Sequence, residues 1–173
     1  MKYEFTGETK TVNTLLRTIT YRRIRAKVAF GIVKAGEVGG WIEKEENLSD
    51  DGDAWVFGDA EVSGNARVSG NARVFGNARV FGDAEVSGDA WVSGNAEVLK
   101  TTHIFVIGPA GSRNAYTTFY RDKDNEINVR CGCFCEKLDK FLKKVSETHG
   151  TSKYALVYQA SVELAKMQIE LKE

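Results

Sequence analysis

A short glycine-rich segment, Gly108 to Asn114, is the first place in this chain where residue types and spacing could support binding chemistry. Its sequence, GPAGSRN, combines two glycines with a hydroxyl, a guanidinium and an amide, groups that suit an anion or a nucleotide phosphate. It lacks the GKS/T ending of a P-loop, so a plain turn between strands stays open as the alternative. Aromatic and basic side chains follow it, and aromatic stacking with arginine is typical of sites for nucleotide-like ligands. The candidate ligand- or partner-binding residues are Gly108, Gly111, Ser112, Arg113, Asn114, Tyr116, Tyr120, Arg121 and Arg130.

Thiols and imidazoles are the other groups that could do chemistry. Cys131, Cys133 and Cys135 lie within five residues, an odd number that no intramolecular disulfide scheme can fully use, so we expect reduced thiols. The chain has two histidines, His103 and His149, and no second cysteine pair that would complete a tetrahedral metal site. The sequence therefore predicts neither a metal nor another cofactor. The alternative for the cysteines is a strand whose small thiols pack inward at alternate positions.

These candidate groups must be positioned by the elements around them, and the clearest of those is a repeat. From Gly52 the chain runs through eight six-residue units without an insertion, from GDAWVF to GNAEVL. In each unit an Ala and a Val lie two residues apart, so both point to one face of a short strand, and Gly with Asn or Asp supplies the corner. Repetition this regular predicts a solenoid. We expect the preceding blocks from Gly40 to keep the phase, with Ile42 and Leu48 at alanine positions.

If three units complete one coil, residues eighteen positions apart stack on one another. The predicted columns are Glu61, Arg79 and Glu97; Arg67 and Glu85; and Trp55, Arg73 and Trp91. No column then stacks like charges directly, and in the last one a guanidinium would lie between two indoles.

Apolar residues on the outer faces of this solenoid predict contact between subunits. Phe57 and Phe75 would stack on one outer face and Phe81 would lie on another, which forms an exposed apolar strip. The candidate assembly residues are Phe57, Phe75, Phe81, Trp55 and Trp91. We therefore expect a homo-oligomer, either a dimer or a trimer.

The flanking segments differ in composition from the repeats and give three predicted parts. Residues 1–39 read as short strands, and we expect them to cap the open strand edge of the solenoid in residues 40–99. Residues 100–173 read as a small α+β domain with three strands, at 103–107, 115–121 and 126–133, and two helices.

Charge and hydropathy exclude some classes of partner. Lys plus Arg equals Asp plus Glu at 24 each, so nothing in the overall charge predicts nucleic acid as a partner. No apolar run approaches the ~20 residues that span a bilayer, and the first residues lack the apolar stretch of a signal peptide. We expect a cytoplasmic protein with no membrane partner.

Three stretches together resemble a family of uncharacterised proteins from prophages and from Gram-positive or enteric bacteria, often labelled polymer-forming or hexapeptide-repeat proteins. They are residues 21–49, the GNARV repeats, and residues 105–134. The resemblance implies a mainly β fold, a left-handed parallel β-helix of hexapeptide repeats with a small C-terminal α+β domain. It also implies a mobile-element context in a bacterial host cell, and no established chemistry.

Three classes of function remain. Many hexapeptide-repeat proteins are acyltransferases with a histidine base near a coil boundary, but residues 41–99 contain no histidine, and His103 lies in an apolar strand where a structural role is commoner. We expect instead a non-enzymatic binding protein, oligomeric through its solenoid. In the implied context it would sequester or inhibit a bacterial defence protein or a nucleotide-like signal. A hexapeptide-repeat acyltransferase and a purely structural assembly protein are the alternatives.

Overall fold

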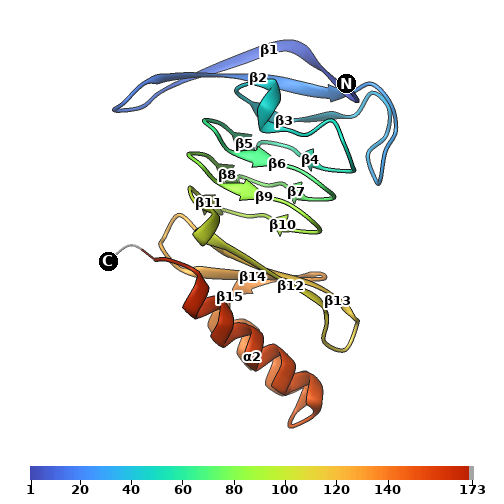
Figure 1. The fold of residues 1–173 in the computed structure, drawn as a ribbon, viewed down its shortest axis with the longest axis vertical. Helices are drawn as coiled ribbons and strands as arrows, with labels where there is room; N and C mark the ends of the chain where they lie inside the picture. Colours follow the sequence, from blue (N-terminus) through green and yellow to red (C-terminus); the bar gives the residue numbers. More distant parts are fainter. Residues whose placement is uncertain (172–173) are drawn as a thin grey trace.

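The six-residue repeats form a β-solenoid in the middle of the computed structural model, which describes residues 1–171 (Figure 1). Each unit gives one two-residue strand: β4 (Trp55–Val56), β5 (Glu61–Val62), β6 (Arg67–Val68), β7 (Arg73–Val74), β8 (Arg79–Val80), β9 (Glu85–Val86), β10 (Trp91–Val92) and β11 (Glu97–Val98). The alanine and valine of every unit are buried. Strands eighteen residues apart pair in parallel, as Trp55 does with Arg73 and Arg67 with Glu85, so three units complete one coil as the sequence predicts.

The first coil departs from this interval. It begins with β3 (Val38–Ile42), where Ile42 pairs with Val62, and Leu48 then pairs with Val68, both twenty residues apart. The expected phase is therefore wrong, because Ile42 and Leu48 occupy valine positions rather than alanine positions. The two extra residues lie in the corner between Leu48 and Trp55, since the interval is eighteen from Trp55 onward.

The corners explain why the repeat keeps its glycines. Gly70 has φ +66°, and a Cβ there would lie 2.9 Å from the backbone nitrogen of Gly88 in the next coil. Beside the glycines, the Asn65 amide donates a hydrogen bond to Asp83 at 3.0 Å. The corner therefore needs both a left-handed backbone and a close approach between coils.

The predicted charge column is present and continues beyond the solenoid at both ends. Arg79 lies between Glu61, at 3.4 Å, and Glu97, at 3.6 Å. Lys10 of the N-terminal segment pairs with Glu61 at 2.8 Å, and Arg121 of the C-terminal segment lies 3.8 Å from Glu97. Alternating charges thus connect all three parts of the chain.

The N-terminal segment caps the upper edge of the solenoid. Strands β1 (Tyr3–Asn13) and β2 (Thr18–Ala26) form an antiparallel hairpin, and β2 pairs with β3. Under this cap Trp55 is completely buried, and its ring packs edge-on against Tyr3 and Phe30. The predicted column keeps its register, but Arg73 stacks on Trp91 rather than between two indoles, and Trp55 cannot serve as an assembly residue.

The C-terminal segment contains four antiparallel strands in sequential order rather than the three predicted. They are β12 (Ile104–Ala110), β13 (Ala115–Arg121), β14 (Ile127–Cys131) and β15 (Phe134–Lys137). The strand expected at 126–133 ends at Cys131, because Gly132 with φ +60° turns the chain back. Helices α1 (Leu138–His149) and α2 (Lys153–Gln168) follow. No helix among the described residues is long and apolar enough to cross a membrane.

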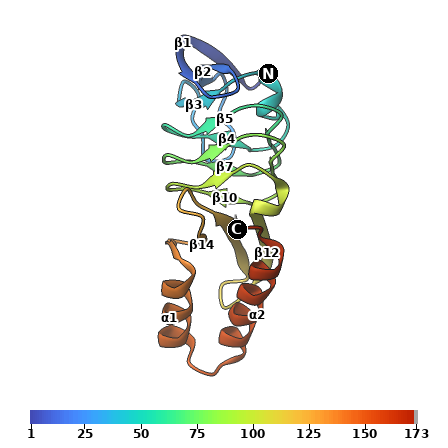
Figure 2. The same cartoon turned by 90° about the vertical axis from the view of Figure 1, so that its left-hand side faces the viewer.

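This sheet lies between the last coil and the two helices (Figures 1 and 2). Alternate residues of a strand point to opposite faces, so Phe119 and Val129 pack with the helices while Tyr120 packs with the solenoid core. Strand β13 crosses the lower edge, where the backbone N–H of Trp91 donates to the Thr118 hydroxyl at 3.0 Å. Both open edges of the solenoid are therefore covered.

Two of the corner glycines in one column, Gly70 and Gly88, allow the close approach of coils to be measured. Gly70→Ala and Gly88→Ala impose the same left-handed strain, about 1 kcal/mol, but only the first places a Cβ against another coil. We expect Gly70→Ala to lower the free energy of unfolding by about 1 to 3 kcal/mol more than Gly88→Ala, the usual range for overpacking. Urea denaturation of both variants measures the difference. Equal losses would mean that the coils do not stack at this corner.

The charge column makes a second prediction. Arg79→Glu places a third carboxylate between Glu61 and Glu97, whereas Arg79→Gln removes the cation without adding an anion. Because Arg79 is 45 % exposed, we expect the Glu variant to be less stable than the Gln variant by only about 1 kcal/mol. Urea denaturation at low and high salt checks this, and the difference should shrink as salt rises.

Candidate functional site

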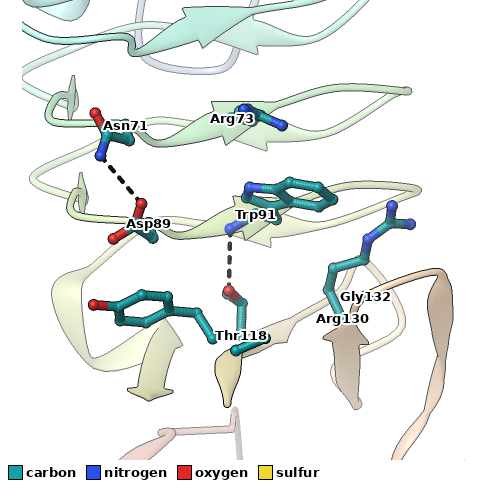
Figure 3. Close-up of a pocket in the computed structure, with 9 residues that line it drawn as sticks. Asn71, Arg73, Asp89, Trp91, Thr118, Arg130 and Gly132 are labelled. Atoms are coloured by element: carbon teal, nitrogen blue, oxygen red, sulfur yellow. Dashed lines mark hydrogen bonds between the residues drawn. The ribbon is translucent and has the colours of Figure 1, made fainter. Parts of the chain in front are cut away.

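A pocket of about 260 Å³ lies where the last two coils meet the C-terminal sheet (Figure 3). Both the repeats and the sheet supply its walls, so neither part forms it alone. The lining residues are Asn71, Arg73, Asp89, Trp91, Ala115, Tyr116, Thr118, Arg130 and Gly132.

Two arginines stack on one indole in this pocket. The guanidinium of Arg73, from β7, lies 4.8 Å from the centre of the Trp91 ring, and that of Arg130, from β14, lies 5.2 Å from it. Arg130 also lies 5.3 Å from the ring of Phe75. The register of the sheet explains this position, because Arg130 is directly opposite Thr118, whose hydroxyl holds the backbone of Trp91.

The electrostatics of the pocket favour an anion. Within residues 1–171, neither Arg73 nor Arg130 has a carboxylate within 4.0 Å, and the buried Nε of Arg130 has no hydrogen-bond partner in this described part. One carboxylate, that of Asp89, lines the same pocket, and it accepts a hydrogen bond from the Asn71 amide at 3.1 Å. The pocket thus holds two cations and one anion, with an amide beside the anion.

The structure divides the residues that the sequence grouped as one site. Tyr116, which is 41 % exposed, and Arg130 line this pocket. Tyr120 and Arg121 are buried at the junction, where they hold the sheet against the solenoid and cannot reach a ligand in solvent. The Tyr120 hydroxyl lies 3.2 Å from the Ser93 hydroxyl and 3.4 Å from the Cys135 thiol. Burial raises the pKa of Tyr120 well above its usual value, so this hydroxyl stays protonated and can donate.

The glycine-rich segment lies elsewhere. Ser112 and Arg113 line a separate hollow of about 400 Å³ against α1 and α2, together with Cys131 and Cys133. Tyr158 of α2 explains why residue 111 is a glycine, because a Cβ on Gly111 would lie 2.2 Å from the Tyr158 hydroxyl. Gly108 likewise has no room for a side chain, since a Cβ there would lie 2.8 Å from Tyr116. Packing therefore accounts for both glycines, and Asn114 continues the turn with φ +48°.

Neither histidine lies in the pocket at the junction. His103 is buried, and its Nδ1 accepts a hydrogen bond from the backbone N–H of Leu99 at 3.2 Å. His149 ends α1 and stacks on Tyr158 at 5.5 Å, beside the second hollow. The three cysteines are free thiols, and Cys131 and Cys135 lie on different strands, which rules out the alternative of a single strand with alternating thiols.

The phenylalanines expected to form an assembly surface are half-buried. Phe57 and Phe75 pack edge-on at 6.3 Å, and Phe75 packs in the same way against Trp91. Phe81 is covered by the Arg79 guanidinium at 5.4 Å. These rings have partners within the chain, so they do not form the exposed apolar strip that the sequence predicted, and Trp91 belongs to the pocket.

The sequence alone did not indicate six of the nine lining residues as parts of a site: Asn71, Arg73, Asp89, Ala115, Thr118 and Gly132. Arg73 and Trp91 were predicted to stack, but as a stabilising column. The composition of that column could have identified Arg73 as a binding residue. Arg73 is a cation with no acidic residue above or below it in the column.

Comparison with known proteins supports the repeat alone. Residues 60–74 and 72–88 match the family described as the YdcK β-solenoid repeat. The chain is therefore similar to β-solenoid repeat proteins in its central part. No curated protein matches the chain.

The two tyrosines of β13 allow the structural role of the junction to be tested separately from the pocket. Tyr120→Phe removes a buried hydroxyl between Ser93 and Cys135, so we expect it to lower the free energy of unfolding by about 1 to 2 kcal/mol. Tyr116→Phe, at an exposed position on the same strand, should change it by less than about 0.5 kcal/mol. Thermal and urea denaturation of both variants compare them. A Tyr120→Phe variant as stable as the parent protein would contradict the structural role.

Proposed function

We propose that this protein is a non-enzymatic binding protein whose pocket binds a small anion of the nucleotide class, with a phosphate and a planar ring. The observation that carries the proposal is the pair of arginines, Arg73 and Arg130, that share the Trp91 ring and have no carboxylate partner among the described residues.

An arginine without an acidic partner is an available anion-binding group. Its planar guanidinium can donate two parallel hydrogen bonds to a phosphate, and the indole keeps that plane in position. Arg73 and Arg130 come from different parts of the chain, yet both are oriented by the same ring. An anion between or beside them would meet donors whose orientation is already fixed, which lowers the entropic cost of binding.

The other lining residues favour a ligand that also has a ring and polar edges. Tyr116 offers an exposed aromatic ring for stacking, while Asn71 and Asp89 offer an amide and a carboxylate to an amino or hydroxyl group. Asp89 would repel a second phosphate placed near it. A nucleoside monophosphate or its cyclic form, with one phosphate, satisfies these conditions better than inorganic phosphate or a triphosphate.

The lining residues provide recognition groups rather than a catalytic pair. Asp89 is the one carboxylate among the nine, and it contacts Asn71 rather than a nucleophile. Tight binding without turnover would make the protein a sequestering factor for a nucleotide-like signal. This accords with the mobile-element context implied by the resemblance.

Isothermal titration with adenosine and guanosine monophosphates and their 3′,5′-cyclic forms tests the proposal. Arg73→Ala and Arg130→Ala should each weaken binding by about tenfold or more, the value of one charge-assisted contact. Tyr116→Ala should weaken it less, through lost stacking. Arg113→Ala is the matched control, because it removes an exposed arginine in the second hollow and should leave binding unchanged.

Two outcomes would overturn the proposal. One is that none of the four nucleotides binds at millimolar concentration. The other is that Arg113→Ala abolishes binding while folded Arg130→Ala binds normally, which would move the site to the glycine-rich segment.

A further inference from the structure

Helix α2 has an apolar face that no other part of the described chain covers. Val157, Leu164 and Met167 are 38 %, 48 % and 84 % exposed, and Ala160 between them is exposed as well. Their spacing of three, four and three residues places them in one stripe along the helix. This is the spacing by which two helices pack side by side.

The opposite face of the same helix is already used. Ala155, Tyr158, Val162 and Ala165 are buried against the sheet and α1. A helix on the surface of a protein normally has one apolar face, whereas α2 has two. The second face therefore predicts a second partner.

We propose that this face binds the same face of a second copy of the chain, with the two α2 helices antiparallel. In that arrangement Val157 lies opposite Met167 of the other copy, and Ala160 lies opposite Leu164. At the centre of the pair this contact occurs twice, and each time the small Ala160 faces the large Leu164 of the other copy. A parallel pair would instead place Ala160 against Ala160 and Leu164 against Leu164, which leaves one layer empty and the next crowded.

Charges along the helix support the antiparallel direction. Lys153 begins the stripe and Glu170 follows its end, so an antiparallel pair places each lysine near the glutamate of the other copy, whereas a parallel pair brings the two lysines together. Antiparallel helix dipoles also attract. Glu163, beside the centre of the stripe, already pairs with Lys166 at 2.8 Å, and Glu170 lies 3.5 Å from Lys100 at an exposed position.

Sedimentation velocity of the full chain across the micromolar range tests this. Because α2 is 16 residues long, or about 24 Å, the contact is small, and we expect a dimer with a dissociation constant on the order of micromolar. Leu164→Glu and Met167→Glu should each weaken it by a hundredfold or so, since a carboxylate would be buried in the contact. Circular dichroism confirms that each variant stays folded, and the exposed change Leu15→Glu in the turn of the β1–β2 hairpin is the matched control.

Charge reversal tests the direction. Lys153→Glu and Glu170→Lys should each weaken an antiparallel dimer at low salt, and the double variant Lys153→Glu with Glu170→Lys should restore it. In a parallel dimer neither single change would weaken association in this way. A monomeric parent protein, a dimer that survives Leu164→Glu, a dimer lost in Leu15→Glu, or a double variant without restored affinity would each overturn the proposal.

Discussion

The stacking of one coil directly on the next is the constraint on which the rest of this structure depends. Parallel strands eighteen residues apart share their backbone hydrogen bonds, so every corner must turn sharply enough for the next coil to pass beneath it. Glycine at the corner meets both demands, since it accepts a positive φ and leaves room for the backbone of the neighbouring coil. A solenoid built in this way always ends in unpaired edges, and both edges here are covered by segments of other composition.

The candidate site follows from how the lower edge is covered. Strand β13 crosses the last coil with Thr118 and Tyr120 facing it, and the strand register then places Arg130 on the same face of the sheet. Arg130 therefore meets Trp91 of β10, which already carries Arg73 of the coil above. The pocket is thus a product of the contact between a repeat and a flank. It brings together two arginines that are 57 positions apart in the chain.

Much of the fold could be predicted from the sequence, because the repeats are local and strict. An eighteen-residue spacing can be read without a structure. It accounts for the interval between coils, for the charge column and for the hydrogen bonds between asparagine and aspartate at the corners. The shift at Ile42 could not be predicted, since two extra residues in an irregular corner leave the hydrophobic pattern intact on either side. The burial of Trp55 and the separation of Tyr116 from Arg113 depend on how the cap and helices pack, and those contacts are long-range. Of the nine residues that line the pocket, two were therefore identified from the sequence as binding residues, Tyr116 and Arg130, while Arg73 and Trp91 were predicted as members of a stacked column.

The completion of one coil by three repeats has a consequence for how this chain can change in length. A duplication of eighteen residues within the repeats would add one coil and return every face to its place, so both caps would meet the side chains that they meet now. A duplication of six would rotate the lower cap by one face of the triangular coil, and Arg130 would then meet a different column from that of Trp91. Growth by whole coils preserves the pocket, and growth by single repeats removes it. Lengths in such a lineage should therefore differ by multiples of three repeats wherever the pocket is kept.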